Sequence, residues 1–141
     1  MAVYPRVPKK QSARATGRGV AGVSYKVALS NADTAGGVLA VANPEGVTLI
    51  VRSLILDVTT KATGACTVDA GIAANGTTSN DTLIDGVDVG TAAGTFDSQK
   101  DAGTNGAGPR RWGASEYLTV SKASGAAAGL AGYAYITYEI A

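Results

Sequence analysis

From Tyr25 onward, the hydrophobic positions of the chain fall into short alternating runs, separated by clusters of Gly, Asn, Asp, Ser and Thr. Alternation over a few residues, bounded by turn-forming residues, predicts half-buried β-strands. We expect strands within residues 24–29, 38–41, 47–60, 65–74, 116–121 and 132–140. No segment has the apolar period of a long amphipathic helix, so the predicted class is all-β.

The most hydrophobic run, VTLIVRSLILDVTT at residues 47–60, changes phase in its middle. The odd positions from Val47 to Val51 are apolar, whereas the even positions from Leu54 to Val58 are apolar. Two structures would explain this change. Either both faces of the strand are covered, or a β-bulge near Arg52 and Ser53 moves the second half onto the face of the first.

Two turn segments predict hairpins. TTKATGA (59–65) would join the strands on either side of it, and SKASGAAAGLAG (121–132) would join the last two strands. In the last strand the inward residues would be Ala134, Ile136, Tyr138 and Ile140, and the outward residues Tyr133, Tyr135, Thr137 and Glu139. About six main strands with long crossings favour a jelly-roll-like β-sandwich.

Residues 75–113 form a long connection, which we expect to contain one short helical turn carrying Leu83 and Ile84. Connections of this length in small domains often bind ligands or partners. Five carboxylates lie close together in this sequence: Asp81, Asp85, Asp88, Asp97 and Asp101. Their spacing does not match a calcium-binding loop. Turn formation, a calcium site and a docking surface for a basic segment all remain open.

Residues 1–22 differ from the rest of the chain. They have two prolines in the first eight positions and no apolar period, which predicts an extended arm attached to a single domain at residues 23–141. The segment GRGVAG (17–22) matches the glycine spacing of a dinucleotide-binding loop by its letters. It neither follows a predicted strand nor opens a helix, so a flexible hinge is the better interpretation.

The charge of the chain is divided between this arm and the domain. The net charge is only +1, but residues 1–26 hold six basic and no acidic side chains, whereas residues 27–141 hold six basic and eleven acidic ones. This polarity favours contact between the arm and an acidic protein surface. Nucleic acid is not the expected partner, because the acidic domain would be repelled by phosphate.

The composition excludes several function classes. The chain has no histidine and a single cysteine, Cys66, which rules out an intrachain disulfide and histidine-based catalysis, along with most zinc sites. No enzymatic activity, cofactor or metal site is therefore expected, with calcium at the aspartates kept only as the alternative given above. There is no apolar segment after the N-terminal basic residues and no run of the ~20 apolar residues that a membrane span needs. We expect a soluble protein without a secretion signal or a membrane partner.

Arg110, Arg111 and Trp112 form one basic and aromatic cluster within the domain. It could contact a ligand, but a lone tryptophan in a chain poor in large side chains is more often an anchor in a core or an interface. The outward residues Tyr133 and Tyr135 would suit an interface between subunits.

Residues 58–97 and the ending from Tyr117 resemble small β-structured virion proteins of tailed bacteriophages, in particular head decoration (cement) proteins. The resemblance covers about residues 47–141 and lies in the Ala-, Gly- and Thr-rich strands, the lack of histidine and the basic arm. It implies a protein added to the capsid exterior in many copies, often as trimers, where it clamps neighbouring capsid subunits. It also implies that the arm engages the capsid through Arg6, Lys9, Lys10, Arg14 and Arg18.

The function we expect is therefore structural: decoration and stabilisation of a phage capsid, with the major capsid protein and other copies of this chain as partners. The alternative is a carbohydrate- or receptor-binding module of a phage head or tail fibre, with its site formed by residues 75–113 and Trp112.

Overall fold

The computed structural model describes residues 23–141, which form nine β-strands and no helix. In chain order the strands are β1 (Val23–Ala28), β2 (Leu39–Ala42), β3 (Leu49–Thr60), β4 (Cys66–Ala73), β5 (Ile84–Asp88), β6 (Gly94–Asp97), β7 (Arg110–Trp112), β8 (Tyr117–Gly125) and β9 (Ala131–Ile140). The predicted all-β class is confirmed. The predicted arm at residues 1–22 lies outside the described residues.

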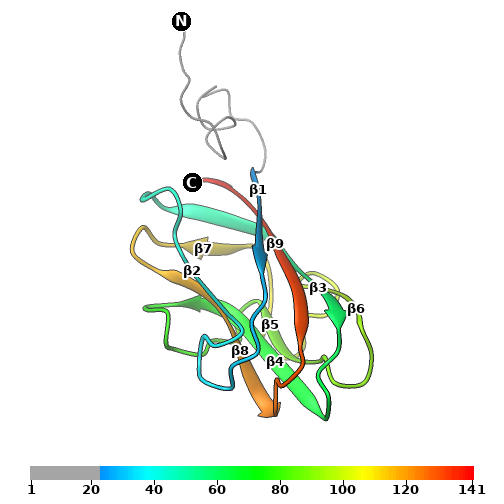
Figure 1. Ribbon diagram of the computed structural model, residues 1–141. Coiled ribbons are helices and arrows are strands. Elements are labelled where there is room, and N and C mark those ends of the chain that lie inside the picture. Colours follow the sequence, from blue (N-terminus) through cyan, green and yellow to red (C-terminus); the bar gives the residue numbers. More distant parts are fainter. Residues whose placement is uncertain (1–22) are drawn as a thin grey trace, which may run out of the picture.

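The strands form two antiparallel sheets packed face to face (Figure 1). Sheet A has the order β1-β9-β3-β6, with β7 also paired to β3, and sheet B has the order β2-β8-β4-β5. The pairing is nested: β1 pairs with β9, β2 with β8, β3 with β6 and β7, and β4 with β5. A long antiparallel ribbon rolled over into two sheets has this pairing, so the sandwich is jelly-roll-like, as predicted.

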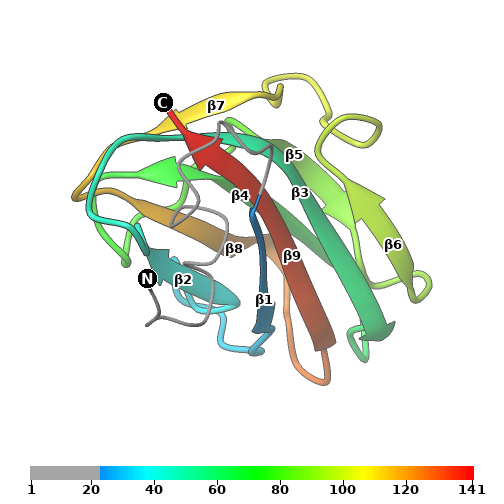
Figure 2. The same cartoon turned by 90° about the horizontal axis from the view of Figure 1, so that it is seen from above.

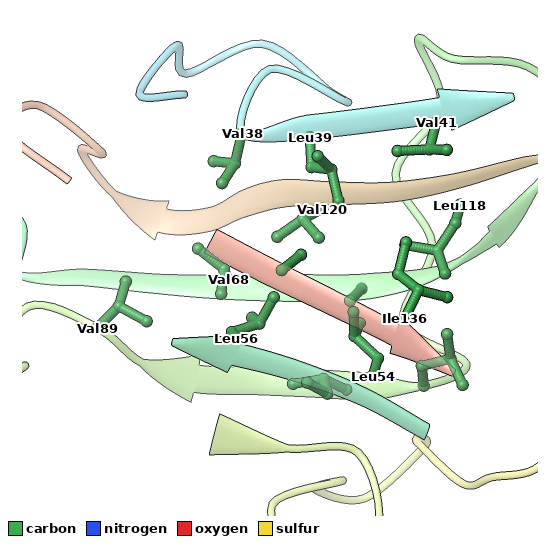
Figure 3. Packing of buried hydrophobic residues seen from close by; sticks show 14 of the residues in the cluster. Val38, Leu39, Val41, Leu54, Leu56, Val68, Val89, Leu118, Val120 and Ile136 are labelled. Carbon is green, nitrogen blue, oxygen red and sulfur yellow. The ribbon is translucent and has the colours of Figure 1, made fainter. Parts of the chain in front are cut away.

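The core lies between the sheets and is built from the inward residues of each strand. Figure 3 shows Leu39 and Val120 from sheet B facing Leu54, Leu56 and Ile136 from sheet A. All five side chains are buried, and each such burial stabilises the fold by about 1.5–3 kcal/mol. In β9 the predicted inward residues Ala134, Ile136 and Tyr138 are fully buried, but Ile140 is 47% exposed because it lies at the end of the strand.

The phase change in β3 is a β-bulge. The pairing of β3 with β9 shifts between Val51 and Ser53, so Arg52 is the extra residue. Val51 and Leu54 consequently both point inward and are fully buried. The bulge coincides with a break on the other side of β3, where β7 pairs with residues 49–51 and β6 with residues 55–58. Figure 2 shows β7 and β6 along different parts of β3.

Two side chains that follow β6 satisfy the backbone at this bulge. The Ser98 hydroxyl oxygen accepts a hydrogen bond from the Leu54 amide at 2.9 Å, and the Ser98 amide donates to the Leu54 carbonyl oxygen at 2.9 Å. The Gln99 side-chain amide donates to the Arg52 carbonyl oxygen at 3.0 Å. Ser98 is fully buried. The bulge is therefore held by specific polar contacts and not by packing alone.

Both predicted hairpins are wrong. β3 and β4 lie in different sheets, as do β8 and β9, so the two turn segments connect the layers. These connections close one end of the core with Ala62, Ala127 and Leu130, which are all buried. The Thr63 amide donates to the Ala128 carbonyl oxygen at 2.9 Å and joins one connection to the other.

The predicted helical turn in residues 75–113 is also wrong, since this segment contains β5, β6 and β7. The Asn80 side chain does act as a local cap, but it closes an Asx turn by accepting from the amide and hydroxyl of Thr82 at 3.0 and 2.6 Å. The chain then joins β4, because the Leu83 amide donates to the Ala70 carbonyl oxygen at 2.8 Å. The local sequence is compatible with a helical turn or a strand, and pairing with β4 selects the extended structure.

Candidate interaction surface

The outer face of sheet B is covered by the chain's own loops. Thr119 and Ser121 of β8 point away from the core, yet both are buried. The Thr119 hydroxyl donates to the Thr78 carbonyl oxygen at 2.9 Å, and the Ser121 hydroxyl oxygen accepts from the Gly36 amide at 2.8 Å. Loops before β2 and before β5 therefore occupy this face, which leaves the centre of sheet B closed to a partner.

Among residues 23–141, no loop is hydrogen-bonded across the outer face of sheet A in this way. Successive strands of this sheet lie side by side in Figure 2, and their pairing aligns one row of outward residues. Lys26 of β1 is opposite Tyr135 of β9, Tyr135 is opposite Ile55 of β3, and Ile55 is opposite Asp97 of β6. Lys26 is exposed, and the other three are half-buried.

A second row lies beside the first and contains Ala28, Tyr133, Asp57 and Thr95, again from β1, β9, β3 and β6. Tyr133 is 39% exposed, one of few large hydrophobic residues at the described surface. We call these two rows together the outer A face. It places Tyr133 and Tyr135, the two tyrosines predicted to point outward, near the middle of a four-strand surface.

Lys26 is organised by these tyrosines. Its ammonium nitrogen lies 4.3 Å from the centroid of the Tyr133 ring and 5.8 Å from that of the Tyr135 ring. A cation over an exposed aromatic ring contributes about 0.5–1 kcal/mol, enough to favour one position for a long side chain. Lys26 was missed in the sequence, because its place beside the tyrosines depends on the pairing of β1 with β9, which the sequence pattern does not specify.

The same side of sheet A continues toward β7. Arg111 is exposed and opposite Ile50, which is opposite Glu139. Arg52 donates to the Glu139 carboxylate at 2.9 Å in a surface ion pair. Of the predicted basic cluster, Arg111 is thus the residue that shares a surface with the tyrosines.

Arg110 and Trp112 have other roles. The Arg110 Nε donates to the carbonyl oxygens of Thr82 and Ala107 at 2.9 and 3.2 Å, which fastens the segment before β5 to the loop before β7. Trp112 is fully buried, although it was a predicted partner-binding residue.

Trp112 is a core anchor. Its Nε1 donates to the Glu116 carbonyl oxygen at 3.0 Å, and its ring meets the Tyr138 ring edge to face at 6.2 Å between centroids. Neighbouring residues of a strand point to opposite faces, so Arg111 and Trp112 cannot form one surface cluster. A sugar-binding site around Trp112 is therefore not supported, because the buried ring cannot stack on a sugar.

The aspartates of the long connection serve turns. The Asp88 carboxylate accepts from the Thr91 hydroxyl at 2.6 Å and from the Gly90 and Thr91 amides at 2.8 and 3.0 Å. These hydrogen bonds, the Thr91 hydroxyl foremost, lower the pKa of Asp88 below its ordinary value. Asp85 accepts from the Asn105 amide at 3.0 Å. Within residues 23–141, no three acidic, cysteine or histidine side chains form a group suited to a metal ion.

Burial raises the pKa of the Asp69 carboxyl, while its hydrogen bond from the Gly86 amide at 2.8 Å acts in the opposite direction. The neighbouring Asp85 and Asp81 raise it further. This group braces the β4–β5 side of sheet B, away from the outer A face. Burial likewise raises the pKa of the Cys66 thiol, and a raised thiol pKa disfavours the reactive thiolate.

The predicted arm contacts Arg6, Lys9, Lys10, Arg14 and Arg18 lie outside the described residues, as does the glycine segment 17–22. What the structure does place is the first described residue, Val23, at the start of an edge strand of sheet A and opposite Tyr138 near the C-terminus. The described residues contain no helix of the length and apolar character required to cross a membrane.

Comparison with known proteins gives a match in structure but none in sequence. No family model and no curated protein matches the chain. A chain in the solved structure of the capsid of Ralstonia phage GP4 has a similar fold, with a TM-score of 0.52 and 20% sequence identity. The match covers 86% of this chain and 88% of that chain, so the two chains are of nearly equal length. They share a whole fold.

Proposed function

We propose that this protein is a structural component of a phage virion, one that decorates the capsid exterior and stabilises it. The observation that carries the proposal is the fold shared with a chain of the phage GP4 capsid over 86% of this chain.

The charge distribution suggests how such a component would attach. Residues 1–22 carry five basic side chains and no acidic ones, and residues 23–141 carry an excess of acidic side chains. We assign the arm residues Arg6, Lys9, Lys10, Arg14 and Arg18 to contact with the major capsid protein. Each exposed charge contact contributes only about 0.2–1 kcal/mol, so attachment would rely on several contacts per copy and on many copies per particle.

Deletion of residues 1–20 tests the attachment. The deletion ends before β1, so the sandwich keeps all nine strands. We expect a folded protein that no longer binds capsids lacking it, measured by co-sedimentation with such particles and by electron microscopy of the product.

A matched variant keeps the length of the arm and removes its charge, with Arg6, Lys9, Lys10, Arg14 and Arg18 all changed to Gln. The control for this variant is a chain whose arm has the natural amino-acid composition but a shuffled sequence, so that its charge is unchanged. Loss of binding in the neutral arm with retention in the shuffled arm would assign attachment to charge. Full capsid occupancy by the deletion variant would contradict the role of the arm, and no binding by the intact chain would contradict decoration itself.

A further inference from the structure

We propose that the outer A face is an interface between two copies of this chain related by a two-fold axis. The order of the residues in its first row suits such a contact. From β1 to β6 this row reads cation, aromatic, aliphatic, carboxylate: Lys26, Tyr135, Ile55 and Asp97. A row of this kind is complementary to its own reversal, which an isologous contact requires.

The axis that produces the reversal runs between β9 and β3, parallel to both strands and within the interface. Rotation about it places Lys26 against the partner's Asp97 and Tyr135 against the partner's Ile55. The same rotation places Tyr133 of the second row against the partner's Asp57, where a phenol hydroxyl can donate to a carboxylate. Two sheets stacked in this way pack as aligned sheets do within a β-sandwich.

The groups on this face have capacity for such contacts. Within the described residues no donor is hydrogen-bonded to the half-buried Asp57 carboxylate, and Lys26 lies over tyrosine rings with no carboxylate bonded to it. The Asp97 carboxylate accepts one hydrogen bond, from the Gln99 backbone amide at 2.8 Å. Docking would add a charge partner to Lys26 without removing its ring contacts.

The size of the face suits a weak contact. The strands β1, β9, β3 and β6 have six, ten, twelve and four residues, and at about 3.4 Å per residue and 4.8 Å between strands they cover about 500 Å² per copy. Two copies would bury about 1,000 Å² in total, which is the lower limit for a specific interface. We therefore expect a weak, reversible dimer that forms at high concentration. The resemblance to decoration proteins implies a trimer, so the mass in solution separates the two.

Light scattering coupled to size exclusion, on the full chain from low micromolar to several hundred micromolar concentration, tests the interface. We expect a mass rising from one copy to two. Lys26→Asp and Asp97→Lys each place like charges against one another twice per dimer, and each should raise the dimer dissociation constant about tenfold or more. Lys61→Asp makes the same charge change in the turn after β3, away from the face, and should leave the constant unchanged.

Mixing the two face variants is the decisive step. In a mixed pair, both charge contacts regain opposite signs, so equimolar K26D and D97K should form a dimer that neither forms alone. Circular dichroism and thermal melting of each variant show whether the sandwich stays folded. If either variant is unfolded, Tyr135→Lys on the same row replaces it, with an expected loss of dimer and no rescue.

Three results would overturn the proposal: a monomer at every concentration, a mass of three copies, or variants that weaken association without rescue on mixing. None of these measurements uses capsids. A negative result for the dimer would therefore not contradict the proposed capsid role, and a negative result for capsid binding would not contradict the dimer.

Discussion

At the scale of single residues, the polar contacts at the β3 bulge illustrate how one hydroxyl can stabilise a whole strand. Ser98 is fully buried and accepts the hydrogen bond of the Leu54 amide at 2.9 Å. Ser98→Ala removes the acceptor and leaves a buried amide unpaired, which costs about 1–3 kcal/mol. We expect that loss in the free energy of unfolding, measured by urea denaturation.

The control is Ser124→Ala, whose hydroxyl pairs with that of Thr67 at 2.7 Å on the exposed surface. This change should stay within about 0.5 kcal/mol, because water replaces the lost partner. Equal effects of the two substitutions would mean that Ser98 is not needed to hold the bulge.

At the scale of elements, the loops over sheet B depend on a close approach of two glycines. Gly36 has φ +73°, and a Cβ there would overlap the carbonyl oxygen of Gly76. Gly46 has the same φ but open space around it. Both Gly→Ala changes carry the backbone cost of a left-handed alanine, about 1–2 kcal/mol. We expect Gly36→Ala to destabilise by about 1–3 kcal/mol more than Gly46→Ala, since only it also forces the loops apart.

Hydrogen exchange separates this cause from general destabilisation. In Gly36→Ala, exchange should rise first at the Gly36 amide, whose acceptor is the Ser121 hydroxyl, and in the neighbouring loops. Identical stability of the two alanine variants would show that the loops move apart at no cost.

The sequence predicted the strands and their faces better than their partners. Alternation is local, so six strands (β1, β2, β3, β4, β8 and β9) and the outward tyrosines of β9 followed from it. β5 and β6 were missed because short runs containing Gly and Asp give little periodic signal, and β7 was missed because it has only three residues. The predicted strand partners were wrong at both hairpins, because a turn that connects two sheets has the same kind of sequence as a turn that joins two neighbouring strands. Only the pairing shows that Lys26, Ile55 and Asp97 share a row.

At the scale of the whole molecule, the two proposed contacts involve residues of different character. Residues 1–22 offer five positive charges, whereas the outer A face combines tyrosines, Ile55 and a few charges of both signs. Salt screens exposed charges over about 10 Å at 0.1 M and about 3 Å at 1 M, but it does not weaken apolar burial. The two proposed contacts should therefore respond differently to ionic strength.

We expect capsid binding to weaken steeply as NaCl is raised from 0.05 to about 1 M, while the dimer dissociation constant changes only a few-fold. Co-sedimentation with capsids reports the first quantity and light scattering the second, on the same preparation. The neutral-arm variant gives the matched control, because its residual capsid binding should lose the steep salt dependence. Capsid binding that persists in high salt would assign attachment to apolar burial, and the outer A face would then be the first surface to test for contact with the shell.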